Sequence, residues 1–124
     1  MELYPPIPVL RIFDEQLALK HYVEFLGFTV DWTHRFGANF PIFMQISRGD
    51  CVIQLSEHHG DACPGASLRI RVDGLDELQR SLAQQDYKYA KPGVPIDKPW
   101  ADRELELGDP FGNRLTFYEP IPSA

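Results

Sequence analysis

Apolar and polar residues alternate along several short stretches of the chain, in the pattern of β-strands that bury one face. The first stretch, residues 7–13, is followed by Asp14, a residue type that commonly caps the start of a helix. Apolar residues then recur at helical spacing as far as Gly27, where the helix is expected to end. The chain therefore opens with a strand and a helix.

Three more extended stretches follow this helix and complete a βαβββ order, at residues 28–34, 40–47 and 51–57. The last two are joined by Arg48-Gly49-Asp50, a short hairpin signal. The second half of the chain repeats the order, with a strand at 67–72, a helix at about 76–85, a short strand around 87–90, a long loop, and a hairpin formed by 102–107 and 113–119.

The repeat is also visible in individual residues. Residues 53–57, Ile-Gln-Leu-Ser-Glu, match residues 115–119, Leu-Thr-Phe-Tyr-Glu, which lie 62 positions later. We therefore expect an α+β fold of two βαβββ modules, at about residues 7–60 and 66–119, within one domain that spans residues 1–124. The modules are expected to form a curved mixed sheet, with helices on its apolar face and a polar, partly aromatic pocket on the other.

Composition narrows the range of functions. The chain has 124 residues, 44% of them hydrophobic, which suits one compact domain with a buried core. A formal net charge of -6 argues against a nucleic-acid partner and is compatible with a cationic ligand. No apolar run is long enough to cross a membrane, and the first residues lack the pattern of a secretory signal. We expect a cytoplasmic protein in which Cys51 and Cys63 are free thiols.

Three motifs together resemble the glyoxalase/bleomycin-resistance (vicinal oxygen chelate) superfamily, and within it the bleomycin-resistance-type proteins most closely. They are Phe25-Leu26-Gly27-Phe28, Ser56-Glu57-His58-His59-Gly60-Asp61, and Pro99-Trp100 followed by Asp109-Pro110-Phe111-Gly112-Asn113. The resemblance extends from about Ile7 to Glu119. It implies paired βαβββ modules, assembly as a homodimer, and ligand clefts formed with the partner subunit.

Metalloenzymes of this superfamily hold their metal at four sheet positions, which the resemblance places on Ile7, Gln54, Ser67 and Thr116. Transition metals need imidazole, carboxylate or thiolate donors at such positions. Isoleucine has no donor, and neutral amides and hydroxyls are weak ones. We therefore expect no metal cofactor and no metal-based electrophilic chemistry.

Alternation along the strands and the resemblance together suggest a set of ligand-binding residues. They are Trp100, Phe43, Gln45, Gln54, Ser67, Arg69, Glu104, Arg114, Thr116 and Tyr118. An aromatic residue in a Pro- and Gly-rich loop, such as Trp100, can wall a cleft, or it can simply anchor the loop. The charged members can orient a polar ligand, or they can pair with one another. Trp32 and Phe36 are further candidates for the rim of the cleft.

The segment Glu57-His58-His59-Gly60-Asp61 suggests a surface metal site. Against this interpretation, adjacent side chains in extended structure diverge, so His58 and His59 do not easily grip one ion. Glu57 and Glu119 end their strands at matching positions, where carboxylates are usually solvated.

The function that these observations favour is non-enzymatic capture. No catalytic triad, phosphate loop or Cys-x-x-Cys motif occurs in the sequence. We expect the protein to bind and sequester a bulky cationic small molecule, in the manner of bleomycin-family antibiotic resistance. The alternatives are a divergent lyase, isomerase or thiol transferase, with Glu57, Glu104 or Glu119 in acid–base roles, or a binder of an ordinary metabolite.

Overall fold

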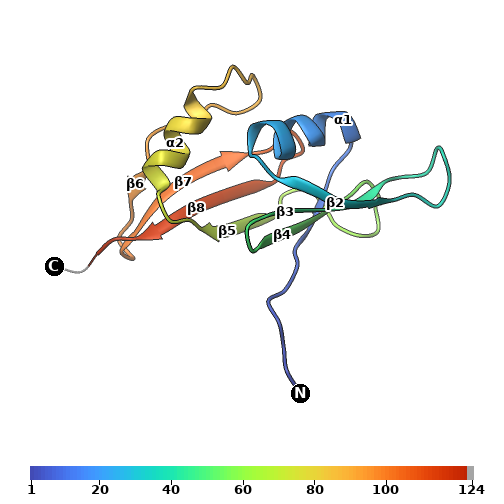
Figure 1. Cartoon of the computed structure of the whole chain (residues 1–124), viewed down its shortest axis with the longest axis horizontal. Helices are drawn as coiled ribbons and strands as arrows, with labels where there is room; N and C mark the ends of the chain where they lie inside the picture. The colour runs from blue at the N-terminus through green and yellow to red at the C-terminus, as the bar shows by residue number, and fades with distance from the viewer. Residues whose placement is uncertain (123–124) are drawn as a thin grey trace. The chain divides into compact units, whose positions relative to one another are not determined.

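The computed structural model describes residues 1–122 and divides into two compact units, which we call module 1 (residues 1–64) and module 2 (from residue 65 onward). Each module contains a four-stranded sheet of its own, with helical structure over one face (Figure 1). The prediction of an α+β fold built from two βαβββ modules is confirmed. Within residues 1–122 each strand pairs with strands of its own module, so these strands form two sheets where one curved sheet was expected.

Module 1 consists of β1 (Val9–Arg11), α1 (Glu15–Ala18), the π-helix η1 (Leu19–Phe25), β2 (Thr29–His34), β3 (Phe43–Arg48) and β4 (Cys51–Ser56). Its helix starts where the sequence predicts, because the Asp14 side chain accepts a hydrogen bond of 2.8 Å from the Leu17 backbone N–H. The helical segment ends at Phe25, and Gly27 two residues later has a φ of +78°, which glycine adopts at little cost.

The module 1 sheet has the strand order β1-β4-β3-β2, with β1 parallel to β4 and the other pairs antiparallel. Alternate residues of the central strands, such as Met44, Ile46 and Ile53, are completely buried, together with Ala18 and Tyr22 of the helix. This packing leaves the other face of the sheet, with Phe43 and Gln45, open. Cys51 and Cys63 are free, and burial raises the pKa of the Cys51 thiol.

Module 2 consists of β5 (Ser67–Arg71), α2 (Leu75–Ala83), β6 (Ile96–Asp97), β7 (Asp102–Gly108) and β8 (Arg114–Pro120). The strand order β5-β8-β7-β6 repeats the arrangement of module 1. Three leucines of α2, at 75, 78 and 82, are buried, and Figure 1 shows the helix lying over β7 and β8. None of the helices among residues 1–122 has the length and hydrophobicity that crossing a membrane requires.

The prediction of a short strand around residues 87–90 is wrong. The second strand of module 2 is β6, at Ile96–Asp97, and residues 87–90 form a loop with a turn. The cause is the tight turn before β7, in which the Lys98 N–H donates to the Asp102 carbonyl at 2.8 Å. Because a tight turn fixes the register of a hairpin, residues 96 and 97 become the partners of β7.

Candidate functional site

The open face of the module 1 sheet brings together three predicted ligand-binding residues, Phe43, Gln45 and Gln54. Gln45 lies directly opposite Gln54 on the neighbouring strand, and the Gln54 side chain donates to the Gln45 side chain at 3.0 Å. Gln45 in turn donates to the Asp31 carboxylate at 3.1 Å. A bulge in β2 at this point turns Asp31 toward β3. The two amides are thus held in place by a hydrogen-bonded row.

The same module contains a pocket, which we call the aromatic pocket, of about 380 Å³. It is lined by Trp32, His34, Phe36, Phe43, His58 and Asp61. The Trp32 and Phe43 rings are stacked, with centroids 5.7 Å apart and planes inclined by 25°. Phe36 makes edge contacts with both imidazoles, at 4.7 Å to His34 and 6.3 Å to His58. The pocket therefore offers ring faces and edges together with one carboxylate.

Asp61 is held in this pocket by its own hydrogen bonds. The Ser56 hydroxyl donates to Asp61 at 2.7 Å and accepts from the His58 backbone N–H at 3.0 Å. Glu57, which the sequence suggested to be solvated, instead accepts a hydrogen bond from the Ile42 backbone N–H at 2.9 Å. Trp32 and Phe36, expected at the rim of a cleft, line this pocket. His34 was not predicted as a pocket residue, although it lies two residues after Trp32 on the same strand.

The remaining predicted residues lie in module 2. Ser67, Arg69, Arg114, Thr116, Tyr118 and Glu104 share one face of its sheet, because they occupy matching positions in the β5–β8 and β7–β8 registers. This face is opposite to the one that α2 covers. Thr116 and Glu104 are buried there, whereas Ser67, Arg69 and Arg114 are exposed.

Glu104 is the centre of a polar cluster on this face. Its carboxylate lies 2.8 Å from the Arg69 guanidinium and accepts a hydrogen bond of 2.7 Å from the Trp100 indole N–H. Arg69 also pairs with Asp102 at 3.0 Å and lies over the Tyr118 ring at 4.7 Å. The hydrogen bond from Arg69 keeps the pKa of Glu104 below its ordinary value, and the Glu104 carboxylate raises the pKa of Arg69. The interpretation of mutual pairing therefore holds for Arg69 and Glu104.

Trp100 combines a fixed edge with an open face. Its indole N–H is bound to Glu104, yet 58% of the residue is exposed. The next residue, Ala101, has a φ of +68°, in the left-handed region that favours glycine. The turn thus presents the indole away from the core at the cost of a strained alanine.

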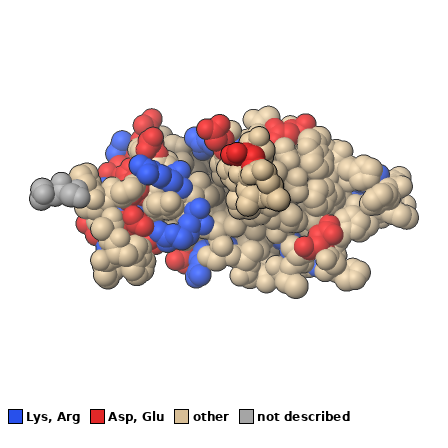
Figure 2. All heavy atoms as spheres, turned by 90° about the horizontal axis from the view of Figure 1, so that it is seen from below, with Lys and Arg blue, Asp and Glu red and all other residues tan. Residues whose placement is uncertain are grey.

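Acidic charge is unevenly distributed between the modules. Residues 1–64 contain four Lys and Arg against eight Asp and Glu, whereas residues 65–124 contain eight against ten. On the face shown in Figure 2, Lys and Arg side chains gather over module 2, toward the C-terminus. The aromatic pocket accordingly belongs to the more acidic module, which favours a cationic ligand.

The four positions at which a metal would be expected do not fit a metal ion. In the sheets, the residue opposite Gln54 is Val9 and the residue opposite Thr116 is Arg69, two residues after Ile7 and Ser67 respectively. Whether the strand position is taken as Ile7 or Val9, and as Ser67 or Arg69, the side chain there is not an imidazole, a carboxylate or a thiolate. Within residues 1–122, no group of three or more His, Cys, Asp or Glu side chains could hold a metal, including the segment around His58 and His59.

A family model described as glyoxalase superfamily protein matches residues 3–123. The chain belongs to the glyoxalase superfamily. No curated protein matches the sequence.

Solved structures of several binding proteins share the fold. A bleomycin-binding protein from bleomycin-producing Streptomyces verticillus, complexed with copper(II)-bleomycin, is 27% identical with a TM-score of 0.71, over 99% of both chains. A bleomycin-binding protein complexed with bleomycin is 23% identical with a TM-score of 0.72, over 94% of this chain and 98% of that one. TnmS3, an antibiotic binding protein from Streptomyces sp. CB03234, is 19% identical with a TM-score of 0.71, over 97% and 99%.

Proposed function

We propose that this protein binds and sequesters a bulky cationic small molecule of the bleomycin type, in the cytoplasm and as a homodimer whose clefts include the partner subunit. The observation that carries the proposal is the aromatic pocket, in which the stacked Trp32 and Phe43 rings lie beside the Asp61 carboxylate. The similarity in fold to bleomycin-binding and antibiotic-binding proteins supports it.

The pocket has the chemistry to hold a flat cation. Trp32 is 42% exposed and Phe36 is 74% exposed, so a ligand that covers them removes apolar area from water. Aromatic faces also attract a positive charge through their quadrupole. Asp61 adds a carboxylate that is already oriented by Ser56, so little entropy is lost when a cation binds.

Capture requires no chemical step. A protein in excess over a toxic ligand, with a dissociation constant below the free concentration, depletes that ligand by mass action. The three glutamates considered for acid–base catalysis are each engaged elsewhere. Glu57 and Glu119 accept hydrogen bonds from backbone N–H groups, and Glu104 is tied to Arg69 and Trp100. These contacts favour binding over catalysis.

The test is a fluorescence titration with copper-free bleomycin. Because both tryptophans lie at predicted contact positions, we expect saturable quenching of the wild-type protein. Trp100→Ala should reduce the quenching, and Trp32→Ala should reduce it more than Trp100→Ala does. At about 1 mM ligand only a very weak affinity would escape detection. A spectrum that is unchanged at this concentration would therefore contradict the proposal.

A charge variant tests the role of Asp61. Asp61→Asn should weaken bleomycin binding by roughly tenfold, the loss expected for one charge-assisted contact. The matched control is Asp50→Asn, at the turn between β3 and β4, which should leave the affinity unchanged. Equal effects of the two substitutions would mean that only net charge matters and that the pocket is not the site.

A further inference from the structure

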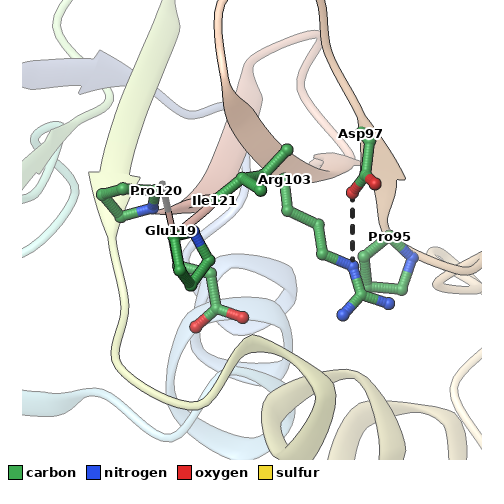
Figure 3. A pocket seen from close by; sticks show the side chains of 7 residues that line it. Pro95, Asp97, Arg103, Glu119, Pro120 and Ile121 are labelled. Atoms are coloured by element: carbon green, nitrogen blue, oxygen red, sulfur yellow. Dashed lines mark ion pairs between the residues drawn. The ribbon is translucent and has the colours of Figure 1, made fainter. Parts of the chain in front are cut away.

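A second pocket, of about 480 Å³, lies in module 2 and is separate from the residues of the proposed function. Its walls are Pro95, Pro120, Ile121 and Pro122, and its charged residues are Asp97, Arg103 and Glu119. We call it the proline-walled pocket (Figure 3). Its volume lies within the range of small-molecule sites.

This pocket opens on the helix side of the module 2 sheet. Arg103 and Glu119 each neighbour a residue of the open face, Glu104 and Tyr118 respectively, and successive side chains of a strand point to opposite faces. The contacts agree with this direction. Arg103 pairs with Asp76 of α2 at 2.8 Å, and Glu119 accepts hydrogen bonds of 3.3 Å from the Gly74 and Leu75 N–H groups at the start of α2.

Arg103 and Glu119 carry opposite charges and face each other across neighbouring strands. Within residues 1–122, however, they form no ion pair with each other. Such cross-strand pairs normally attract each other. Here each side chain is drawn away, Arg103 by Asp76 and by Asp97 at 3.8 Å, and Glu119 by the start of α2. In Figure 3 the two charged groups project from the same side of the ribbon, with a gap between them.

Both groups retain unused hydrogen-bonding capacity toward this gap. A guanidinium has five N–H donors, and within residues 1–122 Arg103 makes one hydrogen bond, to Asp76. Only one oxygen of Glu119, Oε2, accepts hydrogen bonds in the described part of the chain. The ion pairs with Asp76 and Asp97 draw the guanidinium away from Glu119. The pocket thus presents a donor fork and a carboxylate oxygen at a distance from each other.

The walls of the pocket favour an apolar body between these charges. A proline has no N–H group and a rigid ring, so Pro95 and Pro120 present apolar surface without a hydrogen-bond donor. In Figure 3 Pro95 lies beside the guanidinium, and Pro120 and Ile121 lie beside Glu119. From this arrangement we propose that the proline-walled pocket binds a free α-amino acid with an apolar side chain, whose carboxylate contacts Arg103 and whose ammonium contacts Glu119.

The experiment is an NMR titration of the ¹⁵N-labelled protein with three probes of similar size. L-Phenylalanine carries both charges, phenethylamine lacks the carboxylate, and 3-phenylpropionate lacks the ammonium. We expect L-phenylalanine to shift the amide signals of Arg103, Glu119 and Ile121, with an affinity at least about tenfold above either single-charge probe. Equal affinity for one of the single-charge probes, or no shifts at about 10 mM L-phenylalanine, would overturn the proposal.

Two variants locate the site. Arg103→Gln and Glu119→Gln should each lower the affinity for L-phenylalanine by at least about tenfold, and the amide oxygen introduced by Glu119→Gln can still accept hydrogen bonds from the start of α2. The matched controls are Arg71→Gln and Glu106→Gln, on the opposite face of the same sheet, which should bind as the wild type does. Retained affinity in both pocket variants would overturn the assignment. If a variant unfolds, the probe comparison on the wild-type protein decides alone.

Discussion

Glu104 shows how one side chain can organise a surface. Only 8% of its surface is exposed, and its carboxylate accepts hydrogen bonds from Arg69 and from the Trp100 indole. The sequence placed Glu104 and Arg69 on one face by strand alternation. It could not give the contact with Trp100, because the turn between residues 98 and 101 decides where that loop residue points.

The pH dependence of stability should report the Glu104 contacts. The pKa of Glu104 is lowered from 4.5, chiefly by the Arg69 hydrogen bond, so its stabilising effect is present above that value and is lost as the pH falls through the folded-state pKa. Glu104→Gln should therefore reduce the free energy of unfolding by about 1 kcal/mol at neutral pH, since Arg69 is partly solvated, and by less at pH 3. Urea unfolding at the two pH values measures this. An equal loss at both would contradict the assignment.

Ala101 is the one non-glycine residue with a positive φ among residues 1–122. An L-residue in this conformation costs about 1–2 kcal/mol, and glycine gives back part of that gain through its larger unfolded-state entropy. Ala101→Gly should raise the free energy of unfolding by about 0.5–1 kcal/mol in urea denaturation. Ala83→Gly, at the exposed end of α2, should lower it by a similar amount. Destabilisation by both substitutions would disprove the strain.

Among the elements, the β3–β4 and β7–β8 hairpins were predicted well because their turns carry local signals. The turn between β7 and β8 is held by Asp109, which accepts hydrogen bonds of 2.8 Å from the Phe111 and Asn113 backbone N–H groups. The strand β6 was misplaced because its pairing depends on the register of β7, and residues 87–90 carry no local signal of that register. The π-helical geometry of η1 was likewise invisible, because residues 19–25 have ordinary helical spacing.

Removal of the Asp109 side chain should loosen this hairpin. Asp109→Ala deprives two backbone N–H groups and the Asn113 side chain of their acceptor, and we expect a loss of about 2–3 kcal/mol in unfolding free energy. The control is Asp50→Ala, at the turn between β3 and β4. Within residues 1–122 the Asp50 side chain makes no hydrogen bond that this substitution would remove. A loss of under about 0.5 kcal/mol for Asp109→Ala, the range of ordinary surface substitutions, would contradict this role.

At the scale of the whole molecule, the fold class followed from the repeated strand and helix order and from the three motifs. Strand parity also predicted which strand residues share the face of each sheet opposite the helix, whereas their binding of a ligand stays a prediction. The aromatic pocket could not be derived in the same way. It unites β2, β3 and the loop after β4, and the positions of His58 and Asp61 depend on loop hydrogen bonds that no periodic pattern encodes.

Capture without conversion can be tested by native mass spectrometry of the protein with copper-free bleomycin. We expect a dimer that takes up the ligand to a fixed stoichiometry and releases it with an unchanged mass. Protein that stays unliganded at high bleomycin concentration, or ligand recovered with an altered mass, would show that the protein does not act by capture.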